Sequence, residues 1–192
     1  MFEPLRKRIE AEGQSMGGGI LKVDPFINHQ VDPDLMDACG KEFAVLFKET
    51  QPTKILTAEI SGIAPALMTA KYMGVPVVYA RKHKPVTMPD TVYLTVAPSH
   101  TKGRMVELIV SPEYLAQGER VLIIDDFLAS GATIAGLVRL AQTAGARVVG
   151  IGALIEKTFE EGRGVLSHLG VPIKALVEIS SLDHGKIIFA EA

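Results

Sequence analysis

The chain has 192 residues, a formal net charge of -2, 47% hydrophobic residues and 22% charged residues. This composition excludes a disordered protein, and the length favours one domain over residues 1–192. The balance of charge provides no general attraction to nucleic acid or to anionic lipid, so we expect neither a nucleic acid nor a membrane as a partner.

Residues 1–48 precede the regular part of the sequence and contain several different signals. They combine a charged helical pattern, three consecutive glycines at Gly17–Gly19, the strand-like stretch ILKVD at 20–24 and a helix that begins near Asp32-Pro33-Asp34. An aspartate cap and a proline in the first turn are typical of a helix start. We predict that residues 1–48 mainly form a hood over the sheet that follows.

Residues 53–180 alternate short apolar runs with amphipathic helical patterns. The predicted strands are KILTAE at 54–59, VPVVYA at 75–80, VLII at 121–124, RVVGIGALI at 147–155 and VPIKALVEI at 171–179, with helices between them at 63–74, 134–145 and 159–170. This alternation predicts an α/β fold with a doubly wound, mainly parallel sheet and helices on both faces. Ligands bind such sheets at the carboxyl ends of the strands, so the loops to inspect follow Thr57, Ala80, Ile124 and Ile155.

Residues 85–112 interrupt this alternation. VYLTV at 92–96 and MVELIV at 105–110 alternate apolar and polar residues, with the turn-forming PSHTKG between them. The pattern predicts an antiparallel hairpin. We expect a flexible loop that closes over a bound ligand and excludes water from it.

The stretch VLIIDDFLASGAT at 121–133 places two adjacent aspartates and a turn of small residues between a core strand and a helix. A helix N-terminus presents unpaired backbone N–H groups that bind phosphate, and Ser130 and Thr133 add hydroxyl donors. The carboxylates of Asp125 and Asp126 accept hydrogen bonds from a sugar diol but repel phosphate. The loop can therefore hold a ribose and its 5′-phosphate together, although an acidic turn that only caps the helix has the same composition.

Two common nucleotide motifs are absent from this stretch. The Walker A loop requires G-x-x-x-x-G-K-S/T, and the dinucleotide fingerprint requires G-x-G-x-x-G after a strand. The sequence therefore disfavours a nucleoside triphosphatase and a dehydrogenase.

The stretch VLIIDDFLASGAT resembles the phosphoribosyl pyrophosphate (PRPP) motif of the type I phosphoribosyltransferases. The segments at 21–36, 60–84 and 150–163 are similar to the bacterial members of this family that use xanthine. The resemblance implies the type I phosphoribosyltransferase fold and transfer of ribose 5-phosphate from PRPP to xanthine. The products would be xanthosine 5′-monophosphate (XMP) and diphosphate, in a purine salvage reaction with Mg²⁺ carried by PRPP.

The same resemblance implies roles for individual residues. Asp125 and Asp126 would be catalytic, and the base would contact three residues, namely Leu21, Asn28 and Lys157. The 5′-phosphate would bind the segment that comprises Ala129, Ser130, Gly131, Ala132 and Thr133. Without the resemblance to this family, the sequence pattern would predict that Asn28 is a cap or turn residue and that Lys157 is a surface lysine.

Two further segments are candidates for the diphosphate. Ser61 and Gly62 lie between a predicted strand and a helix, where an anion loop or an ordinary capped turn would fit equally well. Arg81, Lys82 and Lys84 follow the next strand, and such a run forms either an anion site or a solvated face. In this family such cations often reach the diphosphate of a neighbouring subunit, which implies a homodimer.

Two other functions are compatible with the loop. One is a regulator that senses PRPP, and the other is a transferase for hypoxanthine, guanine or adenine. Ala129 stands where some purine-specific members carry an aspartate, so the identity of a general base is open. The five histidines show no metal-ligand spacing, so we expect no metal held by the protein alone.

The number of cysteines and the length of the apolar runs indicate the cellular compartment. Cys39 is the only cysteine, which excludes an intramolecular disulfide and fits a reducing compartment. No apolar run approaches the roughly 18 residues that cross a bilayer. We therefore predict a cytoplasmic protein.

Overall fold

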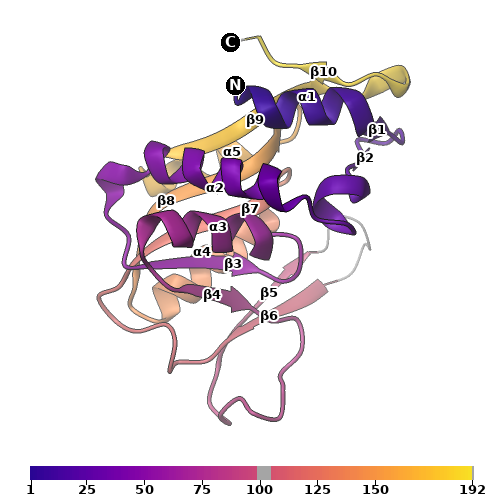
Figure 1. Cartoon of the computed structure of the whole chain (residues 1–192). Helices are drawn as coiled ribbons and strands as arrows, with labels where there is room; N and C mark the ends of the chain where they lie inside the picture. Colours follow the sequence, from indigo (N-terminus) through magenta and orange to yellow (C-terminus); the bar gives the residue numbers. More distant parts are fainter. Residues whose placement is uncertain (99–104, 192) are drawn as a thin grey trace.

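The computed structural model describes residues 1–98 and 105–191, and Figure 1 shows the whole chain. Its main sheet has six strands in the order β10-β9-β8-β7-β3-β4. β10 is antiparallel to β9, and the other neighbours are parallel. The strands are β3 (Lys54–Ala58), β4 (Val77–Ala80), β7 (Arg120–Leu128), β8 (Arg147–Lys157), β9 (Ile173–Ser181) and β10 (Ile188–Phe189).

The strand order reverses between β3 and β7. From β3 the chain builds outward to β4 on one side, and from β7 it builds through β8 to β9 on the other side. The loops that leave these two central strands therefore diverge to opposite faces. A crevice forms at such a point, at the carboxyl ends of the strands.

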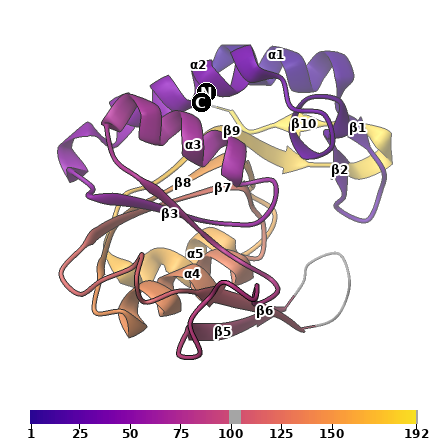
Figure 2. The same cartoon turned by 60° about the horizontal axis from the view of Figure 1, so that its bottom comes forward.

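Helices cover both faces of the sheet, as Figure 2 shows. One face carries α2 (Pro33–Leu46) and α3 (Ile63–Met73), and the other carries α4 (Ala132–Thr143) and α5 (Gly162–Leu166). The VLII run of β7 serves both faces because successive side chains of a strand point in opposite directions. Leu122 and Ile124 belong to the core beneath α2 and α3, whereas Val121 and Ile123 belong to the core beneath α4.

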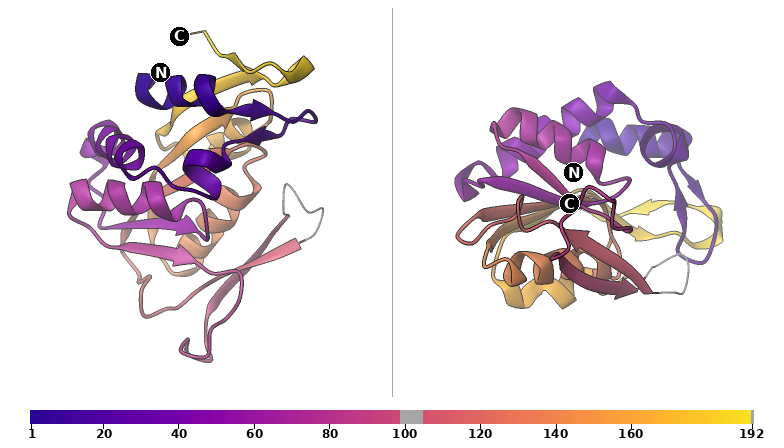
Figure 3. Two further views of the ribbon diagram at one scale, coloured as in Figure 1. Left: turned by 45° about the vertical axis from the view of Figure 1, so that its right-hand side comes forward. Right: turned by 90° about the horizontal axis from the view of Figure 1, so that it is seen from below.

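The N-terminal segment lies at the β9–β10 end of the sheet (Figure 3). It contains α1 (Glu3–Glu12), the short antiparallel pair β1 (Gln14–Ser15) and β2 (Leu21–Lys22), and a π-helical turn, η1 (Asp24–Asn28). The predicted strand at 20–24 was too long, because the chain turns at Asp24. The predicted start of α2 is confirmed, since Asp32 accepts a hydrogen bond from the Leu35 N–H at 3.0 Å.

The predicted antiparallel hairpin is confirmed, with β5 (Tyr93–Pro98) paired to β6 (Met105–Val110) in a separate sheet. Most of the predicted turn, residues 99–103, lies outside the described residues. The hairpin packs on α4, where a Cβ on Gly136 would lie 2.9 Å from Leu108 Cδ1. Arg139 of α4 also donates hydrogen bonds to Thr95 Oγ1 and to the Val96 carbonyl, at 3.0 and 2.8 Å.

Several strand ends differ from the prediction. β7 continues to Leu128 rather than ending at Ile124, and β8 continues to Lys157 rather than ending at Ile155. The prediction ended each strand where its apolar run stopped, whereas backbone pairing continues through the charged residues, as between Asp125 and Ala153. β3 ends at Ala58, and β10 was not predicted at all.

The remaining regular elements are short. Single 3₁₀ turns occur at η2 (Lys48–Thr50), η3 (Ser167–Leu169) and η4 (Asp183–Gly185). Within the described ranges, no helix combines the length and the apolar character needed to cross a bilayer.

Cys39 is fully buried in α2, and burial raises the pKa of its thiol to about 12. The lone thiol is therefore a core residue and not a nucleophile.

Candidate active site

A cavity of about 310 Å³ opens at the carboxyl ends of β3, β7 and β8. Its walls come from the N-terminal segment, the turn after β3, the β5–β6 hairpin and the turn after β7. It brings together most of the site residues predicted from the sequence, namely Leu21, Asn28, Ser61, Gly62, Lys82, Asp125, Asp126, Ala129, Ser130, Gly131, Ala132, Thr133 and Lys157. The cavity thus lies at the point where the strand order reverses.

Residues 129–133, called here the β7–α4 loop, carry the chain from β7 into α4. Gly131 has a φ of 78°, a left-handed conformation that glycine adopts without strain, and α4 begins at the next residue. The N-cap residue Gly131 makes no capping bond, the Ala132 N–H makes only a long 3.5 Å hydrogen bond to Ser130 Oγ, and no acidic residue lies in the first turn. Its first backbone N–H groups are therefore available to an anion in the cavity.

Asp125 and Asp126 lie side by side in the last part of β7. Asp125 is only 5% exposed and accepts a hydrogen bond from the Asp126 N–H at 3.1 Å, while Asp126 accepts one from the Phe127 N–H at 3.0 Å. Burial raises the pKa of Asp125 well above its usual range, and the charge of Asp126 adds to this effect. Burial also raises the pKa of Asp126. Hydroxyl donors or positive charge nearby would therefore stabilise the pair.

The turn after β3 packs directly on this acid pair. A Cβ on Gly62 would lie 2.2 Å from Thr57 Oγ1 and 2.6 Å from Asp125 Oδ1, so the position has room only for glycine. Gly62 is the N-cap of α3 and no side chain makes the capping bond, so Ser61 is not a helix cap. The peptide bond between Glu59 and Ile60 is cis. Thr57 is fully buried, and its hydroxyl has no hydrogen-bond partner within residues 1–98 and 105–191.

The three cations after β4 do not act together in one cavity. Lys82 lines the cavity, and its backbone N–H donates to Glu59 Oε1 at 2.6 Å. Arg81 instead pairs with Ile109 of β6, and Lys84 donates to the Asp90 carbonyl at 3.1 Å. Neither Arg81 nor Lys84 lines the cavity within this chain.

Lys157 is the last residue of β8 and is only 7% exposed, so it is not a surface lysine. Its Nζ donates to the Gly19 carbonyl at 2.6 Å and lies 3.5 Å from Glu160 Oε1 and 5.5 Å from the centroid of the Phe127 ring. Leu21 is buried and Asn28 is exposed, and both line the cavity near the N-terminal segment. Contacts between β8 and the N-terminal segment therefore shape this part of the wall.

The apolar part of the cavity wall was not predicted from the sequence. It consists mainly of Phe127 from β7, Ile134 from α4, and Ala97, Val106 and Leu108 from the hairpin. The alternation in the hairpin could have indicated an inward apolar face, but it gives no information on which helix that face covers. Phe127 directly follows the acid pair. The predicted strand ended before the two aspartates, so Phe127 was not recognised as a strand residue that faces the cavity.

The fold and the site together are those of a type I phosphoribosyltransferase. The strand order reverses at the cavity, and the cavity contains an adjacent acid pair, the N-terminus of α4 and residues of the N-terminal segment. The Phosphoribosyl transferase domain model matches residues 31–165, and the chain belongs to that family. It is 50% identical over 184 residues to the xanthine phosphoribosyltransferase of Deinococcus deserti, covering 96% of this chain and 95% of the relative. The enzyme of the same name from Geobacillus thermodenitrificans is 50% identical over 187 residues, covering 97% and 96%.

Solved structures agree on the fold. The adenine phosphoribosyltransferase of Rhodothermus marinus superposes with a TM-score of 0.72 at 24% identity, covering 92% of this chain and 99% of the other. At that identity the likeness concerns the fold alone. The predicted fold class and the resemblance to the phosphoribosyltransferases are both confirmed.

The raised pKa of Asp125 predicts a pH-dependent cost in stability. The folded state holds the proton more tightly than the unfolded state, so the free energy of unfolding falls as the pH rises above the ordinary aspartate value of 3.8. Without ligand, we expect Asp125→Asn to raise the free energy of unfolding at neutral pH by on the order of 1 kcal/mol. Below pH 3.8 the gain should disappear.

Urea denaturation at neutral pH and at a pH below 3.8 measures this difference. Glu49→Gln is the matched control, because Glu49 is an exposed carboxylate and should show no pH-dependent gain. A loss of stability in Asp125→Asn at neutral pH would contradict the assignment.

Proposed function

We propose that this chain is a cytoplasmic purine salvage enzyme that converts xanthine and PRPP to XMP and diphosphate. The observation that carries the proposal is the cavity itself, which joins the N-terminus of α4, an acid pair of which Asp125 is buried, and residues of the N-terminal segment. The identity of 50% to relatives named xanthine phosphoribosyltransferase over 96% of the chain supports the choice of base.

The β7–α4 loop would hold the 5′-phosphate of PRPP. Its backbone N–H groups and the hydroxyls of Ser130 and Thr133 are donors, and the partial positive charge of α4 favours an anion. Asp125 and Asp126 would accept hydrogen bonds from the ribose hydroxyls. The diphosphate would then extend toward Ser61, Gly62 and Lys82, which line the same cavity.

The transfer breaks the bond between ribose C1 and a diphosphate oxygen and forms a bond between C1 and a xanthine nitrogen, which gives up its proton. Positive charge develops on the sugar as the diphosphate leaves, as in glycoside hydrolysis. The acid pair next to the ribose, with Asp125 shielded from solvent, would stabilise that charge more strongly than water does. Asp125 and Asp126 are for this reason the proposed catalytic residues.

The base would occupy the part of the cavity bounded by Leu21, Asn28 and Lys157. The Asn28 amide can both donate to and accept from a dioxopurine edge, and the Lys157 ammonium can stabilise negative charge on the purine. Ala129 cannot take a proton. Because xanthine is acidic enough to react partly as an anion, Lys157 would lower the need for a general base.

The donor set in the cavity fits a Mg²⁺ ion that arrives with PRPP. Mg²⁺ is usually held by one or two carboxylates together with substrate phosphates, and Asp125 and Asp126 supply the carboxylates here. Among residues 1–98 and 105–191, no group of three or more His, Cys, Asp or Glu is arranged to hold a metal without a substrate. When bound, the ion would neutralise charge on the departing diphosphate.

The hairpin at 85–112 would shield the donor from water. Ala97 and Leu108 line the same cavity as the acid pair with apolar side chains. Excluding water protects the reactive sugar from hydrolysis.

We also propose that the enzyme is a homodimer. Leu67 and Tyr72 of α3 and Tyr79 of β4 are 54%, 41% and 42% exposed beside the strand at the edge of the sheet. Arg81 and Lys84, which do not line the cavity of their own chain, could reach the diphosphate of a second copy. Light scattering should give a mass of about twice 20.6 kDa, and a mass near 20.6 kDa would contradict the dimer.

A turnover assay tests the function directly. The purified protein is mixed with PRPP, Mg²⁺ and, in turn, xanthine, guanine, hypoxanthine or adenine, and nucleotide formation is followed. We expect xanthine to give the highest kcat/KM and Asp126→Asn to lower kcat by roughly 100-fold or more without lowering Tm.

The exposed acid Asp34 provides a control, since Asp34→Asn should leave kcat unchanged. Binding of PRPP without any nucleotide product would favour a PRPP-sensing regulator. Faster turnover of another base would show that the xanthine assignment is wrong.

Lys157→Met tests the base site. Losing the ammonium should raise the KM for xanthine roughly tenfold, the effect of losing one hydrogen bond from a charged group. The KM for PRPP should stay the same, and Lys174→Met, which removes an exposed lysine of β9, should change neither constant. Unchanged affinity for xanthine would remove Lys157 from the base site.

A further inference from the structure

The β7–α4 loop rests on the backbone of Gly162, a residue that does not line the cavity. The Gly162 N–H donates to the Ala129 carbonyl at 3.0 Å. A Cβ on Gly162 would lie 2.2 Å from that oxygen and 2.9 Å from the Gly131 nitrogen, and a Cβ on Gly131 would lie 3.0 Å from Gly162 Cα. The two glycines face each other: a side chain on Gly162 would clash with the loop, and one on Gly131 would press tightly on Gly162.

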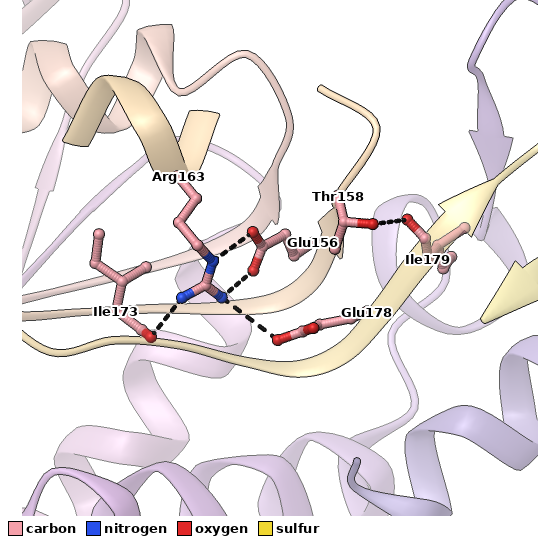
Figure 4. A network of polar contacts seen from close by, with 6 residues as sticks. All are labelled: Glu156, Thr158, Arg163, Ile173, Glu178 and Ile179. Atoms are coloured by element: carbon pink, nitrogen blue, oxygen red, sulfur yellow. Dashed lines mark hydrogen bonds and ion pairs between the residues drawn. The ribbon is translucent and has the colours of Figure 1, made fainter. Parts of the chain in front are cut away.

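The residue that follows Gly162 is tied to the sheet (Figure 4). Arg163 Nε donates to Glu156 Oε1 at 2.7 Å, and its Nη2 donates to the other oxygen of the same carboxylate. Arg163 Nη1 also donates to the Ile173 carbonyl at 3.0 Å, and Nη2 lies 3.4 Å from Glu178 Oε1. Glu156 is only 2% exposed, so the carboxylate holds the guanidinium from within the sheet.

α5 is short, so contacts outside the helix must hold it in place. The helix has five residues, from Gly162 to Leu166, and an isolated helix of that length is not stable. A bidentate pair between arginine and carboxylate has fixed geometry as well as strength. We therefore infer that the position of Gly162 is set largely by the bonds from Arg163 to residues of β8 and β9, together with the buried side chain of Leu166.

We propose that Arg163 is a positioning residue for the donor site. Its pair with Glu156 holds Gly162 as a fixed support under Ala129 and Gly131, so that the N–H groups at the start of α4 keep the geometry that a phosphate group requires. The inference rests on the proposed binding of the 5′-phosphate by the β7–α4 loop. The Arg163–Glu156 pair, which lies outside the cavity, would thus support binding of the phosphosugar.

Substitution of Gly162 tests the support. A methyl group there must displace the Ala129 carbonyl and would misalign the N–H donors of the loop. We expect Gly162→Ala to weaken the affinity for ribose 5-phosphate by roughly 10- to 100-fold, the effect of losing one hydrogen bond to a charged group. Gly164→Ala is the matched control, because a Cβ on Gly164 meets nothing within 4 Å.

Arg163→Lys tests the anchor and also serves if Gly162→Ala does not fold. Lysine keeps the charge but cannot form the two parallel bonds to Glu156 and the bond to Ile173 together. We expect its affinity for ribose 5-phosphate to fall roughly tenfold, with the affinity for xanthine unchanged. A purely structural role would instead lower Tm without this split between the two ligands.

Calorimetric titration of the full chain with ribose 5-phosphate, and with xanthine in the presence of diphosphate, gives both affinities for each variant. Wild-type affinity for ribose 5-phosphate in Arg163→Lys, or in folded Gly162→Ala, would overturn the inference. A wild-type chain that binds no ribose 5-phosphate and forms no nucleotide would instead overturn the proposed function, so the two failures are distinguishable.

Discussion

The arrangement of the cavity depends on placing two adjacent carboxylates, the buried Asp125 and the half-buried Asp126, at the point where the strand order reverses. Taking like charges out of water is unfavourable, and the raised pKa values of Asp125 and Asp126 express that cost. The surrounding chain adapts to the pair, since only a glycine fits at position 62 between Thr57 and Asp125. A site that is unfavourable when empty gains most from a ligand that brings hydroxyl donors and, with a metal, positive charge.

Much of this arrangement could be predicted from the order of residues along the chain. VLII followed by two aspartates and ASGAT is a local signal, because strand, turn and helix start are adjacent in sequence. The alternation of strands and helices likewise predicted the sheet and both helical layers. These features depend on periodicity and turn chemistry, which a short window contains.

Other features depend on long-range contacts that no local pattern contains. The strands extend past their apolar runs because a neighbouring strand continues to pair with them, as Leu128 does with Glu156. The buried ammonium of Lys157 donates to the carbonyl of Gly19, which is distant in sequence. Because the local sequence does not show this partner, a lysine after an apolar run is predicted to be exposed. The different surroundings of the three cations also depend on partners distant in sequence or outside the run, since Arg81 forms a bridge with Ile109 and Lys84 donates to the Asp90 carbonyl.

The end of β8 shows how one strand serves two parts of the proposed site. Successive side chains of a strand point to opposite faces, so Glu156 and Lys157 necessarily diverge. Lys157 points to the cavity and contacts the N-terminal segment, whereas Glu156 meets Arg163 beneath the β7–α4 loop. Base and phosphosugar would therefore be positioned from one rigid strand end, which fixes the distance between the two reacting partners. Because two different residues would carry the two tasks, the N-terminal segment proposed to cover the base could change without moving the support under the proposed phosphate site.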